Sequence, residues 1–297
     1  MPNSLNCEPL ISVIINCHNG EKYLYKAIES VYSQTYSNWE IVFWDNASND
    51  DSHKIVEKFS KKIRYFRSEQ KEILYLARNH AVREAKGEFI TFLDVDDWWE
   101  PTKLKTQLEY AIAKKLTFVF SKYYFLDDFR QKSKIINPCL NNMPSDLSSI
   151  IKNYRIGLLT LFVEKKRFIE LQGFNSEYHI MGDFDFSLRI MKDGNYGCVS
   201  KPLATYRWHG NNESNIYGKE KRIRELEMWI ETNKSKTFFS DKEKSAVKLI
   251  YIYNKALLHL DNISMFLVLL VKVKDLRLSL SLLYHFFKYQ SKKLKAI

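Results

Sequence analysis

The stretch FITFLDVDDWWEP, residues 89–101, predicts both a fold and a site. The apolar and β-branched residues ahead of Asp94 are typical of a buried strand, and Pro101 stands where a helix could begin. Asp94, Asp96 and Asp97 then fall within four positions. Carboxylates gathered at the end of a buried strand repel one another unless a cation neutralises them. Hard oxygen ligands on a short loop suit magnesium or manganese, and these ions in turn suit a diphosphate.

Strands alternate with helices upstream of this stretch. The intervening helices show apolar residues at i, i+3, i+4 and i+7 spacing, which is typical of one buried face. The order predicts an α/β fold, with a mostly parallel sheet flanked by helices and joined by right-handed crossovers. The predicted strands before the acidic stretch are residues 10–16, 39–44 and 63–67.

Polar residues follow the ends of these strands. His18 and Asn19 come after the first strand, Asp45 ends the second, and the acidic cluster ends the fourth. Because ligands of parallel sheets bind at the carboxyl ends of the strands, these side chains are expected in one crevice. No GxGxxG or Walker A loop is present, so a nucleotide would have to be held in another way.

Beyond residue 120 the pattern is less regular. LLTLFV, residues 158–163, predicts a further strand. HIMGDFDFSLRIMKDG, residues 179–194, places Asp183 ahead of a helix, where an aspartate could also serve as the N-cap.

Composition predicts an ordinary globular protein. The chain has 297 residues, of which 45% are hydrophobic and 27% charged. Its four cysteines form no CxxC pair, so neither a zinc site nor a disulfide framework is expected, which fits a reducing compartment. The first ten residues contain no apolar stretch of the kind found in signal peptides. The apolar run at 265–271 is too short to span a bilayer.

The positive charge is concentrated at the carboxyl-terminal end. Residues 217–297 hold 17 Lys and Arg against 8 Asp and Glu, a net charge of +9 out of +11. Their apolar stretches predict helices, which gives two hypotheses: an amphipathic attachment to an anionic membrane, or a helical subdomain that could form a homodimer contact. Nucleic acid is not an expected partner, because no DNA- or RNA-binding motif is present.

Five separated motifs together resemble the family 2 glycosyltransferases, inverting enzymes of GT-A fold that use nucleotide-sugar donors. The resemblance covers roughly residues 9–215, and it implies a catalytic domain over residues 1–216 with a helical extension over 217–297. The motifs are ISVIINCHNGEKYLYKAIESVYSQTYSNWEIV from residue 11, WDNASNDDS from 44, LARNHAVREAKGEFITFLDVDDWWEP from 76, GDFDFSLR from 182 and YRWHGNNES from 206.

The resemblance implies roles in donor binding. Asp45 would accept hydrogen bonds from the base or ribose, and the backbone near His18 and Asn19 would frame the base. Arg78 would reach the diphosphate, since a guanidinium can bind it bidentately. Asp94 would contact the ribose. The donor expected from the family is a UDP-sugar.

The resemblance also implies the catalytic groups. Asp96 with Asp97 would hold Mn²⁺ or Mg²⁺, and His209 would be a further metal ligand or contact the diphosphate. Asp183 would be the general base, with Asp185 as a rival. Either Trp98 or Trp99, directly after the acidic cluster, would contact the acceptor, the other being core.

The chain departs from the family pattern at two places. The usual Pro-x-Tyr-Asn after the first strand is replaced by Asn16-Cys17-His18-Asn19. The usual Glu-Asp of the base motif is replaced by Gly182-Asp183, which retains the aspartate and loses a neighbour that could orient it.

The expected function is therefore transfer of a sugar to a hydroxyl of a glycan or lipid-linked acceptor in bacterial surface polysaccharide synthesis. The expected location is cytoplasmic, with peripheral contact to the inner face of the membrane. Two alternatives remain open at this point. One is a phosphohydrolase of the haloacid-dehalogenase type, which also carries a DxD after a buried strand. The other is a catalytically silent protein that binds sugar nucleotides.

Overall fold

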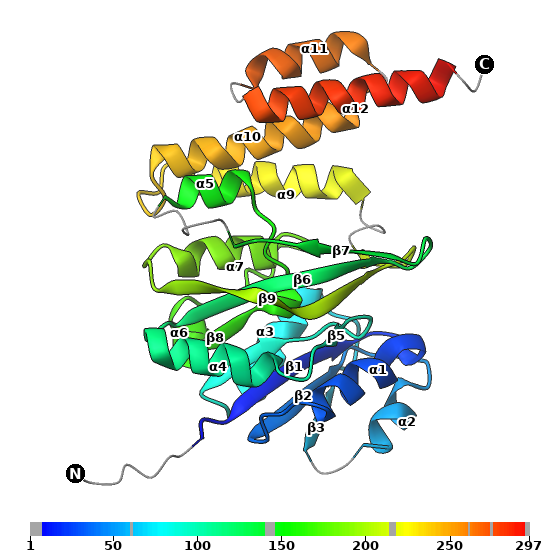
Figure 1. Cartoon of the computed structure of the whole chain (residues 1–297), viewed down its shortest axis with the longest axis vertical. Coiled ribbons are helices and arrows are strands. Elements are labelled where there is room, and N and C mark those ends of the chain that lie inside the picture. The colour runs from blue at the N-terminus through cyan, green and yellow to red at the C-terminus, as the bar shows by residue number, and fades with distance from the viewer. Residues whose placement is uncertain are drawn as a thin grey trace. The chain divides into compact units, whose positions relative to one another are not determined.

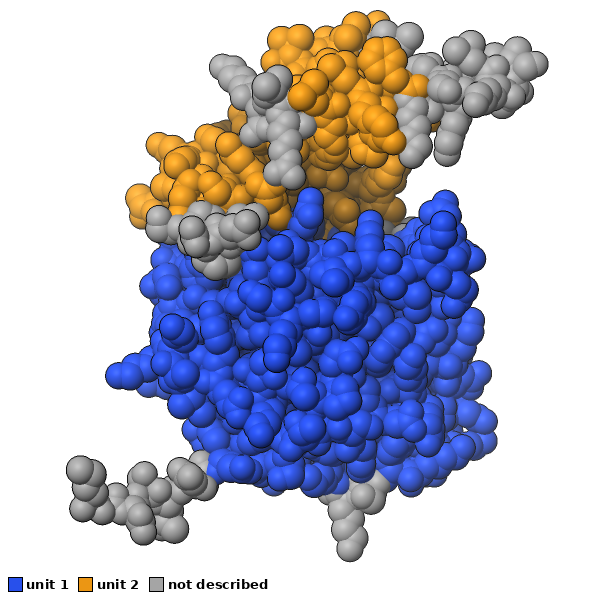
Figure 2. Space-filling view, in the orientation of Figure 1, with its two compact units in different colours: residues 1–145, 154–209 blue, residues 146–153, 210–297 orange. Residues whose placement is uncertain are grey.

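The computed structural model describes residues 8–59, 62–139, 146–213, 218–260, 262–273 and 276–294 (Figure 1). The chain divides into two compact units, drawn in different colours in Figure 2. Unit 1 comprises residues 1–145 and 154–209, and unit 2 comprises residues 146–153 and 210–297. The predicted boundary at 216/217 lies outside the described residues.

Unit 1 is built on one sheet with the strand order β3-β2-β1-β4-β8-β6-β9-β5, to which β7 adds by pairing with β6. Pairing from β3 through β2 and β1 to β4 is parallel, with α1, α2 and α3 in the connections. These elements are β1 (Ile11–Cys17), α1 (Glu21–Tyr32), β2 (Trp39–Asp45), α2 (Ser52–Glu57), β3 (Ile63–Arg67), α3 (Leu74–Glu84) and β4 (Phe89–Phe92).

The sheet is mixed beyond β4. β8 is antiparallel to both β4 and β6, β6 and β9 run parallel, and β5 and β7 are antiparallel additions. The predicted parallel order therefore holds for the amino-terminal half, where helices connect successive strands. The remaining elements of unit 1 are β5 (Trp98–Trp99), α4 (Lys103–Lys114), β6 (Phe118–Asp127), β7 (Lys132–Ile136), η1 (Leu158–Thr160), β8 (Phe162–Glu164), α6 (Lys165–Glu170), α7 (Gly182–Met191) and β9 (Tyr196–Trp208).

The strand predicted over residues 158–163 is wrong in its first half. Residues 158–160 form the 3₁₀ turn η1, in which the Thr160 N–H and hydroxyl both donate to the Gly157 carbonyl. Only residues 162–164 form a strand. A short apolar run is compatible with either structure, because burial alone sets no periodicity.

The core lies on both faces of the sheet. Ile11, Val13 and Ile15 of β1 join the buried faces of α1 and α4 in one cluster. On the other face, four phenylalanine rings pack with centroids 4.8–6.0 Å apart and anchor α7 to the end of β4. They are Phe92, Phe168, Phe174 and Phe186.

The cysteine expectation is wrong, because Cys139 and Cys198 form a disulfide. Their Cα atoms lie 5.5 Å apart although 59 positions separate them in the sequence. β6 pairs with both β7 and β9, so the residues after β7 return to the start of β9. Spacing cannot reveal such a pair, and the cysteine argument for a reducing compartment loses its basis.

Unit 2 is helical. It contains α5 (Leu147–Lys152), α9 (Gly218–Asn233), α10 (Asp241–Leu258), α11 (Ile263–Lys272) and α12 (Leu276–Leu294). α10 begins with a capping box between Ser240 and Glu243, and Lys242 pairs with Asp146 at 2.8 Å, next to α5. No helix among the described residues combines the length and the apolarity that a membrane span needs.

Gly87 offers a test of the sheet. A Cβ there would lie 2.6 Å from the Leu10 carbonyl and from the Ser12 N–H nitrogen, both backbone atoms of the β1 region. We expect Gly87→Ala to lower the free energy of unfolding by about 2–3 kcal/mol, because backbone cannot move aside cheaply. Urea unfolding followed by circular dichroism measures it.

Gly194→Ala is the matched control. A Cβ at Gly194 meets nothing within 4 Å, and its φ of +72° leaves only the left-handed strain. That strain costs about 1 kcal/mol. Equal losses in the two variants would contradict the close approach at Gly87.

Candidate active site

The carboxyl ends of β1, β2 and β4 meet at one edge of the sheet. Cys17 at the end of β1 stands in register with Asp45 at the end of β2. The Leu93 N–H donates to the Ile14 carbonyl at 3.0 Å, so the acidic stretch begins beside the end of β1. The structure thus brings the polar residues predicted at separate strand ends to one edge.

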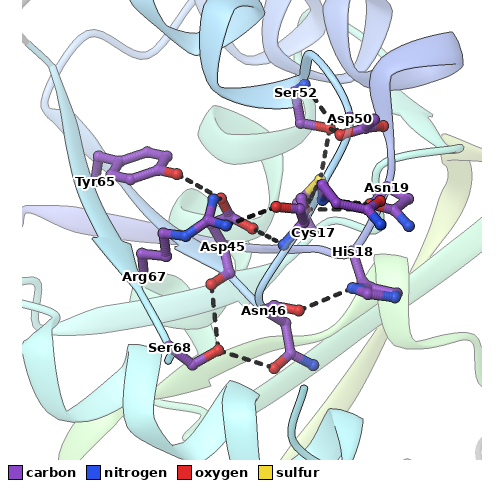
Figure 3. A network of polar contacts seen from close by, with 12 residues as sticks. Cys17, His18, Asn19, Asp45, Asn46, Asp50, Ser52, Tyr65, Arg67 and Ser68 are labelled. Carbon is purple, nitrogen blue, oxygen red and sulfur yellow. Dashed lines mark hydrogen bonds and ion pairs between the residues drawn. The ribbon is translucent and has the colours of Figure 1, made fainter. Parts of the chain in front are cut away.

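Asp45 is fully buried and organises the turn after β2 (Figure 3). Its Oδ1 accepts the Ser48 N–H at 2.7 Å, and its Oδ2 accepts from the Tyr65 hydroxyl and the Arg67 guanidinium, both at 2.5 Å. Burial and the bond to this carboxylate raise the pKa of Tyr65 to about 12. Since a carboxylate has about four acceptor positions, three internal donors leave room for one more.

His18 and Asn19 fasten the loop after β1 to the turn after β2. His18 Nδ1 lies 2.9 Å from the Asn46 carbonyl oxygen. The Asn19 N–H donates to Ser48 Oγ at 3.0 Å, and the Asn49 N–H donates to Asn19 Oδ1 at 2.9 Å. Asn19 has a φ of +56°, a conformation that asparagine tolerates better than most residues. Both predicted residues therefore lie at this edge, in a pre-formed loop.

Arg78 of α3 is buried and pairs with Asp94. Its guanidinium also lies 5.1 Å from the centre of the Tyr75 ring. Burial raises the pKa of Asp94, and the Arg78 charge opposes that rise. Arg78, which the sequence predicts to bind the diphosphate, therefore holds Asp94, which it predicts to bind the ribose, in place.

Asp97 is buried and tied to β9. Its Oδ1 accepts the Arg207 N–H at 2.9 Å, whereas its Oδ2 has no hydrogen-bond partner within the part of the chain that the structure describes. Burial, followed by the charges of Asp96 and Asp94, raises the pKa of Asp97 well above its usual range. Asp97 therefore favours its neutral form, and its charged form would be stabilised by a cation bound beside it.

Asp96 faces His209, with its Oδ2 3.0 Å from His209 Nε2. Arg207 Nε also donates to the Asp96 carbonyl at 3.2 Å, so β9 holds the acidic loop at two points. The sequence places Arg207 in the closing motif YRWHGNNES, two residues before His209, but does not indicate these contacts.

Positively charged side chains and aromatic rings pack in an alternating series next to the loop that carries Asp96 and Asp97. His209 stacks on Tyr23 at 5.0 Å, and the Arg207 guanidinium lies 4.6 Å from Tyr23 and 4.9 Å from Trp98. Lys26 Nζ lies 3.3 Å from the Trp98 ring centre, so the stack continues onto α1. Trp99, by contrast, is 3% exposed and donates to the Leu159 carbonyl. One tryptophan is thus core, as predicted, and Trp98 is the partly exposed one.

The residues present fit a divalent cation completed by its substrate. No three His, Cys, Asp or Glu side chains among the described residues already form a metal cluster. However, magnesium is commonly held by one or two carboxylates together with substrate phosphates. Asp96 Oδ2 lies 3.0 Å from His209 Nε2, and Asp97 Oδ2 is a buried oxygen without a hydrogen-bond partner among the described residues.

Asp183 lies in the first turn of α7 and accepts a 2.8 Å hydrogen bond from the Tyr75 hydroxyl through Oδ1. It is not the N-cap, which is Met181. Burial raises the pKa of Asp183, while the Tyr75 hydroxyl and the Arg78 charge oppose the rise. A carboxylate with a raised pKa, fixed through one oxygen, is suited to accept a proton.

The Tyr75 ring accounts for the glycine at position 182, where the family pattern has a glutamate. A Cβ at Gly182 would lie 2.6 Å from the Tyr75 ring, so a glutamate could not stand there with Tyr75 in place. Tyr75 instead supplies the group that orients Asp183. Sequence reasoning missed Tyr75, because 108 positions separate it from its partner.

Asp185, the rival base, is bound within the fold. Arg189 Nε donates to its Oδ2 at 2.8 Å, and the same guanidinium donates to the Leu171 and Gly173 carbonyls. Asp185 is 6% exposed. Its contacts connect α7 to the preceding loop, which favours Asp183 as the reactive carboxylate.

Two further polar groups lie without partners at the sheet edge. Asn16 is 6% exposed, and neither its amide nitrogen nor its amide oxygen has a hydrogen-bond partner in the described residues; the same holds for Trp44 Nε1. Asn16 and Trp44 stand in register on neighbouring strands. Orphaned buried groups of this kind are rare, and a bound polar molecule would satisfy them.

Known proteins with similar sequences were found over the same region. The family model described as Glycosyl transferase family 2 matches residues 12–191. WfaP of Escherichia coli, a UDP-Glc:alpha-D-GlcNAc-diphosphoundecaprenol beta-1,3-glucosyltransferase, is 38% identical over 208 residues. The match covers 69% of this chain and 80% of that protein.

Solved structures show the same fold. S. aureus TarS 1–349 in complex with UDP-GlcNAc has a TM-score of 0.65 at 18% identity, over 85% of this chain and 73% of that chain. The mannosyltransferase PcManGT from Pyrobaculum calidifontis, in complex with GDP-Man and Mn²⁺, has a TM-score of 0.59 at 15% identity, over 93% and 79%. The predicted α/β fold of GT-A type is confirmed.

Asp97 and Asp185 should respond to neutralisation with opposite signs. Asp97→Asn removes a buried charge that lacks a partner on one oxygen, so we expect the Tm to rise by about 2–4 °C. Asp185→Asn breaks a buried ion pair and should lower the Tm by about 4 °C or more. Differential scanning calorimetry at pH 7 with a chelator present measures both, and a fall for Asp97→Asn would contradict the geometry given above.

Proposed function

The chain belongs to glycosyl transferase family 2, and we propose that it transfers a sugar from a UDP-sugar, with inversion, to a hydroxyl of a lipid-linked acceptor in bacterial surface polysaccharide synthesis. The observation that carries this proposal is a chain of contacts across the site. Asp183 bonds to Tyr75, Tyr75 lies against Arg78, and Arg78 pairs with Asp94. The candidate base and the acidic loop are thereby held by one helix, α3.

The identity of donor and acceptor is supported by the similar proteins. WfaP is named for UDP-Glc and for an acceptor on diphosphoundecaprenol, and TarS was solved with UDP-GlcNAc. UDP-glucose is therefore the first donor to test. Membership of the family is incompatible with the haloacid-dehalogenase alternative.

We assign the proton transfer to Asp183. Tyr75 binds Oδ1, and Oδ2 would take the proton of the acceptor hydroxyl as that oxygen attacks the anomeric carbon. A single displacement with one base inverts the anomeric configuration. A general base of this kind contributes about 10²- to 10⁴-fold to the rate.

The donor side of the site uses the sheet edge. The loop around His18 and Asn19 frames the base, the remaining acceptor position of Asp45 takes a base or ribose donor, and Asp94 takes a ribose hydroxyl. Arg78 acts near the diphosphate by holding Asp94. A divalent cation on Asp96, Asp97 and His209, which the Mn²⁺ in PcManGT supports, would stabilise the charge on the leaving diphosphate.

Nucleotide binding and turnover should separate in two variants. UDP with Mn²⁺ at a hundredfold excess over its Kd should stabilise the wild type by about 2.7 kcal/mol. We expect Asp96→Asn to lose the metal-dependent part of the thermal shift. Asp183→Asn should keep the shift and lose about 10²- to 10⁴-fold in UDP release from UDP-glucose.

Asp51→Asn is the surface control, because the Asp51 carboxylate is 62% exposed and pairs with the exposed Lys54. It should match the wild type in both assays. Binding of UDP without turnover with any acceptor would favour the catalytically silent alternative. No shift with any nucleotide, from folded protein, would overturn the donor site.

The acid limb of the pH–rate profile should follow the Tyr75 hydrogen bond. Asp183 must be deprotonated to act as base, so kcat/KM falls as the pH drops through its raised pKa. The Tyr75 hydroxyl lowers that pKa, so Tyr75→Phe should move the acid limb to higher pH. The profile of kcat/KM from pH 4 to 9 measures the shift.

Tyr154→Phe is the matched control. The Tyr154 hydroxyl contacts Ser187 Oγ at 3.1 Å and the Asp183 backbone carbonyl at 3.5 Å, not the Asp183 carboxylate. Its acid limb should stay in place. An unmoved limb in Tyr75→Phe would remove Asp183 as the titrating base.

A further inference from the structure

Helices α11 and α12 of unit 2 are apolar on two sides. On the inner side, Phe266 and Leu282 are fully buried, and the Phe266 and Phe286 rings stack with centroids 4.5 Å apart. Leu269 and Val273 of the α11 segment join the same cluster, together with Ala256 of α10. This inner side is enough to hold the three helices together as a core.

The outer side of the same helices is also apolar, and it is exposed. On α12, Leu280, Tyr284 and Phe287 follow i, i+4, i+7 spacing and are 58%, 60% and 66% exposed. On α11, Val271 is 81% exposed. A helix that is apolar all round is normally buried, and large exposed apolar patches mark interaction sites. We use the name outer face for the exposed apolar side chains opposite the inner core of the two helices, which are Met265, Leu267, Val268, Val271, Leu280, Tyr284 and Phe287.

The net charge of residues 262–294 indicates which kind of partner would cover the outer face. Residues 262–294 contain six Lys and Arg and a single acidic residue, Asp275. Lys272, at the end of α11 directly after Val271, is exposed. An apolar face on a segment with a net positive charge is complementary to a bilayer with anionic headgroups, where each basic residue strengthens attachment.

We propose that the outer face docks on an anionic lipid bilayer and lies in its interfacial region. α11 has 10 residues and is about 15 Å long, half of the hydrocarbon thickness, so it would lie on the membrane and not cross it. The inference goes beyond the proposed function, since it requires neither a particular donor nor a particular acceptor.

A second copy of the chain is the competing occupant. In a symmetric dimer the same face meets itself, so two strongly basic segments would be brought together with one acidic residue each. Like charges across an interface disfavour that contact. The dimer is therefore an outcome of the test that would overturn the proposal.

Flotation of the full chain with vesicles tests the proposal. We expect it to float with vesicles of phosphatidylcholine and phosphatidylglycerol, and to bind far less to phosphatidylcholine alone. Binding should weaken in about 1 M salt, where the Debye length falls to about 3 Å. The double variant Leu280→Ser/Phe287→Ser should lower the partition coefficient by about tenfold or more.

Matched controls come from unit 1. Ile112 on α4 and Ile169 on α6 are 56% and 57% exposed, so Ile112→Ser/Ile169→Ser removes similar apolar area elsewhere and should leave flotation unchanged. Circular dichroism confirms that the variants fold. Equal loss in both double variants, or no flotation of the wild type, would overturn the proposal. So would light scattering that shows a dimer which Leu280→Ser/Phe287→Ser converts to monomer.

The outcome is independent of catalysis. The thermal shift with UDP and Mn²⁺ should be the same in the wild type and in Leu280→Ser/Phe287→Ser. A protein that floats without binding any nucleotide would leave the membrane inference standing and remove the proposed donor site. A protein that binds UDP and does not float would remove the membrane inference and leave the proposed donor site standing.

Discussion

The mutual repulsion of closely spaced carboxylates is the constraint on which this site depends. Asp94, Asp96 and Asp97 follow one strand, and each is held by a contact from α3 or from the end of β9. Arg78 from α3 neutralises Asp94, His209 faces Asp96, and the Arg207 backbone N–H binds Asp97. The compensation is incomplete, since Asp97 Oδ2 has no partner among the described residues. Binding of a cation would lower the free energy of such a site, which is the physical reason to expect a cation there.

The two departures from the family pattern have different structural consequences. Loss of the glutamate at position 182 is offset by Tyr75, whose ring occupies the space and whose hydroxyl holds Asp183. The replacement of proline by Asn16 has no such internal compensation, because its amide remains unpaired beside Trp44 within the described part of the chain. At position 182, Tyr75 thus holds Asp183, the proposed base, in the place of a neighbouring glutamate. The change at position 16 leaves hydrogen-bonding capacity that a substrate group could use.

Periodicity and strand order made much of this fold predictable. Apolar runs located β1, β2, β3 and β4, and parallel connections then required His18, Asp45 and Asp94 to share an edge. The same reasoning could not locate Tyr75, Arg207 or the Cys139–Cys198 bond. Each depends on a contact across more than fifty positions, which is set by packing and not by local pattern. The error at residues 158–160 has a related cause, because a buried apolar run does not distinguish a turn from a strand.

Both units retain features that folding alone does not explain. In unit 1 these are charged and polar groups that the core would be more stable without. In unit 2 they are apolar side chains whose exposure to water is unfavourable. Burial would remove the cost of the outer face of α11 and α12, and a ligand would remove the cost at the sheet edge. Opposite defects in the two units therefore point to different occupants: a small polar, charged molecule at the sheet edge, and an extended apolar surface with anionic groups at the helices.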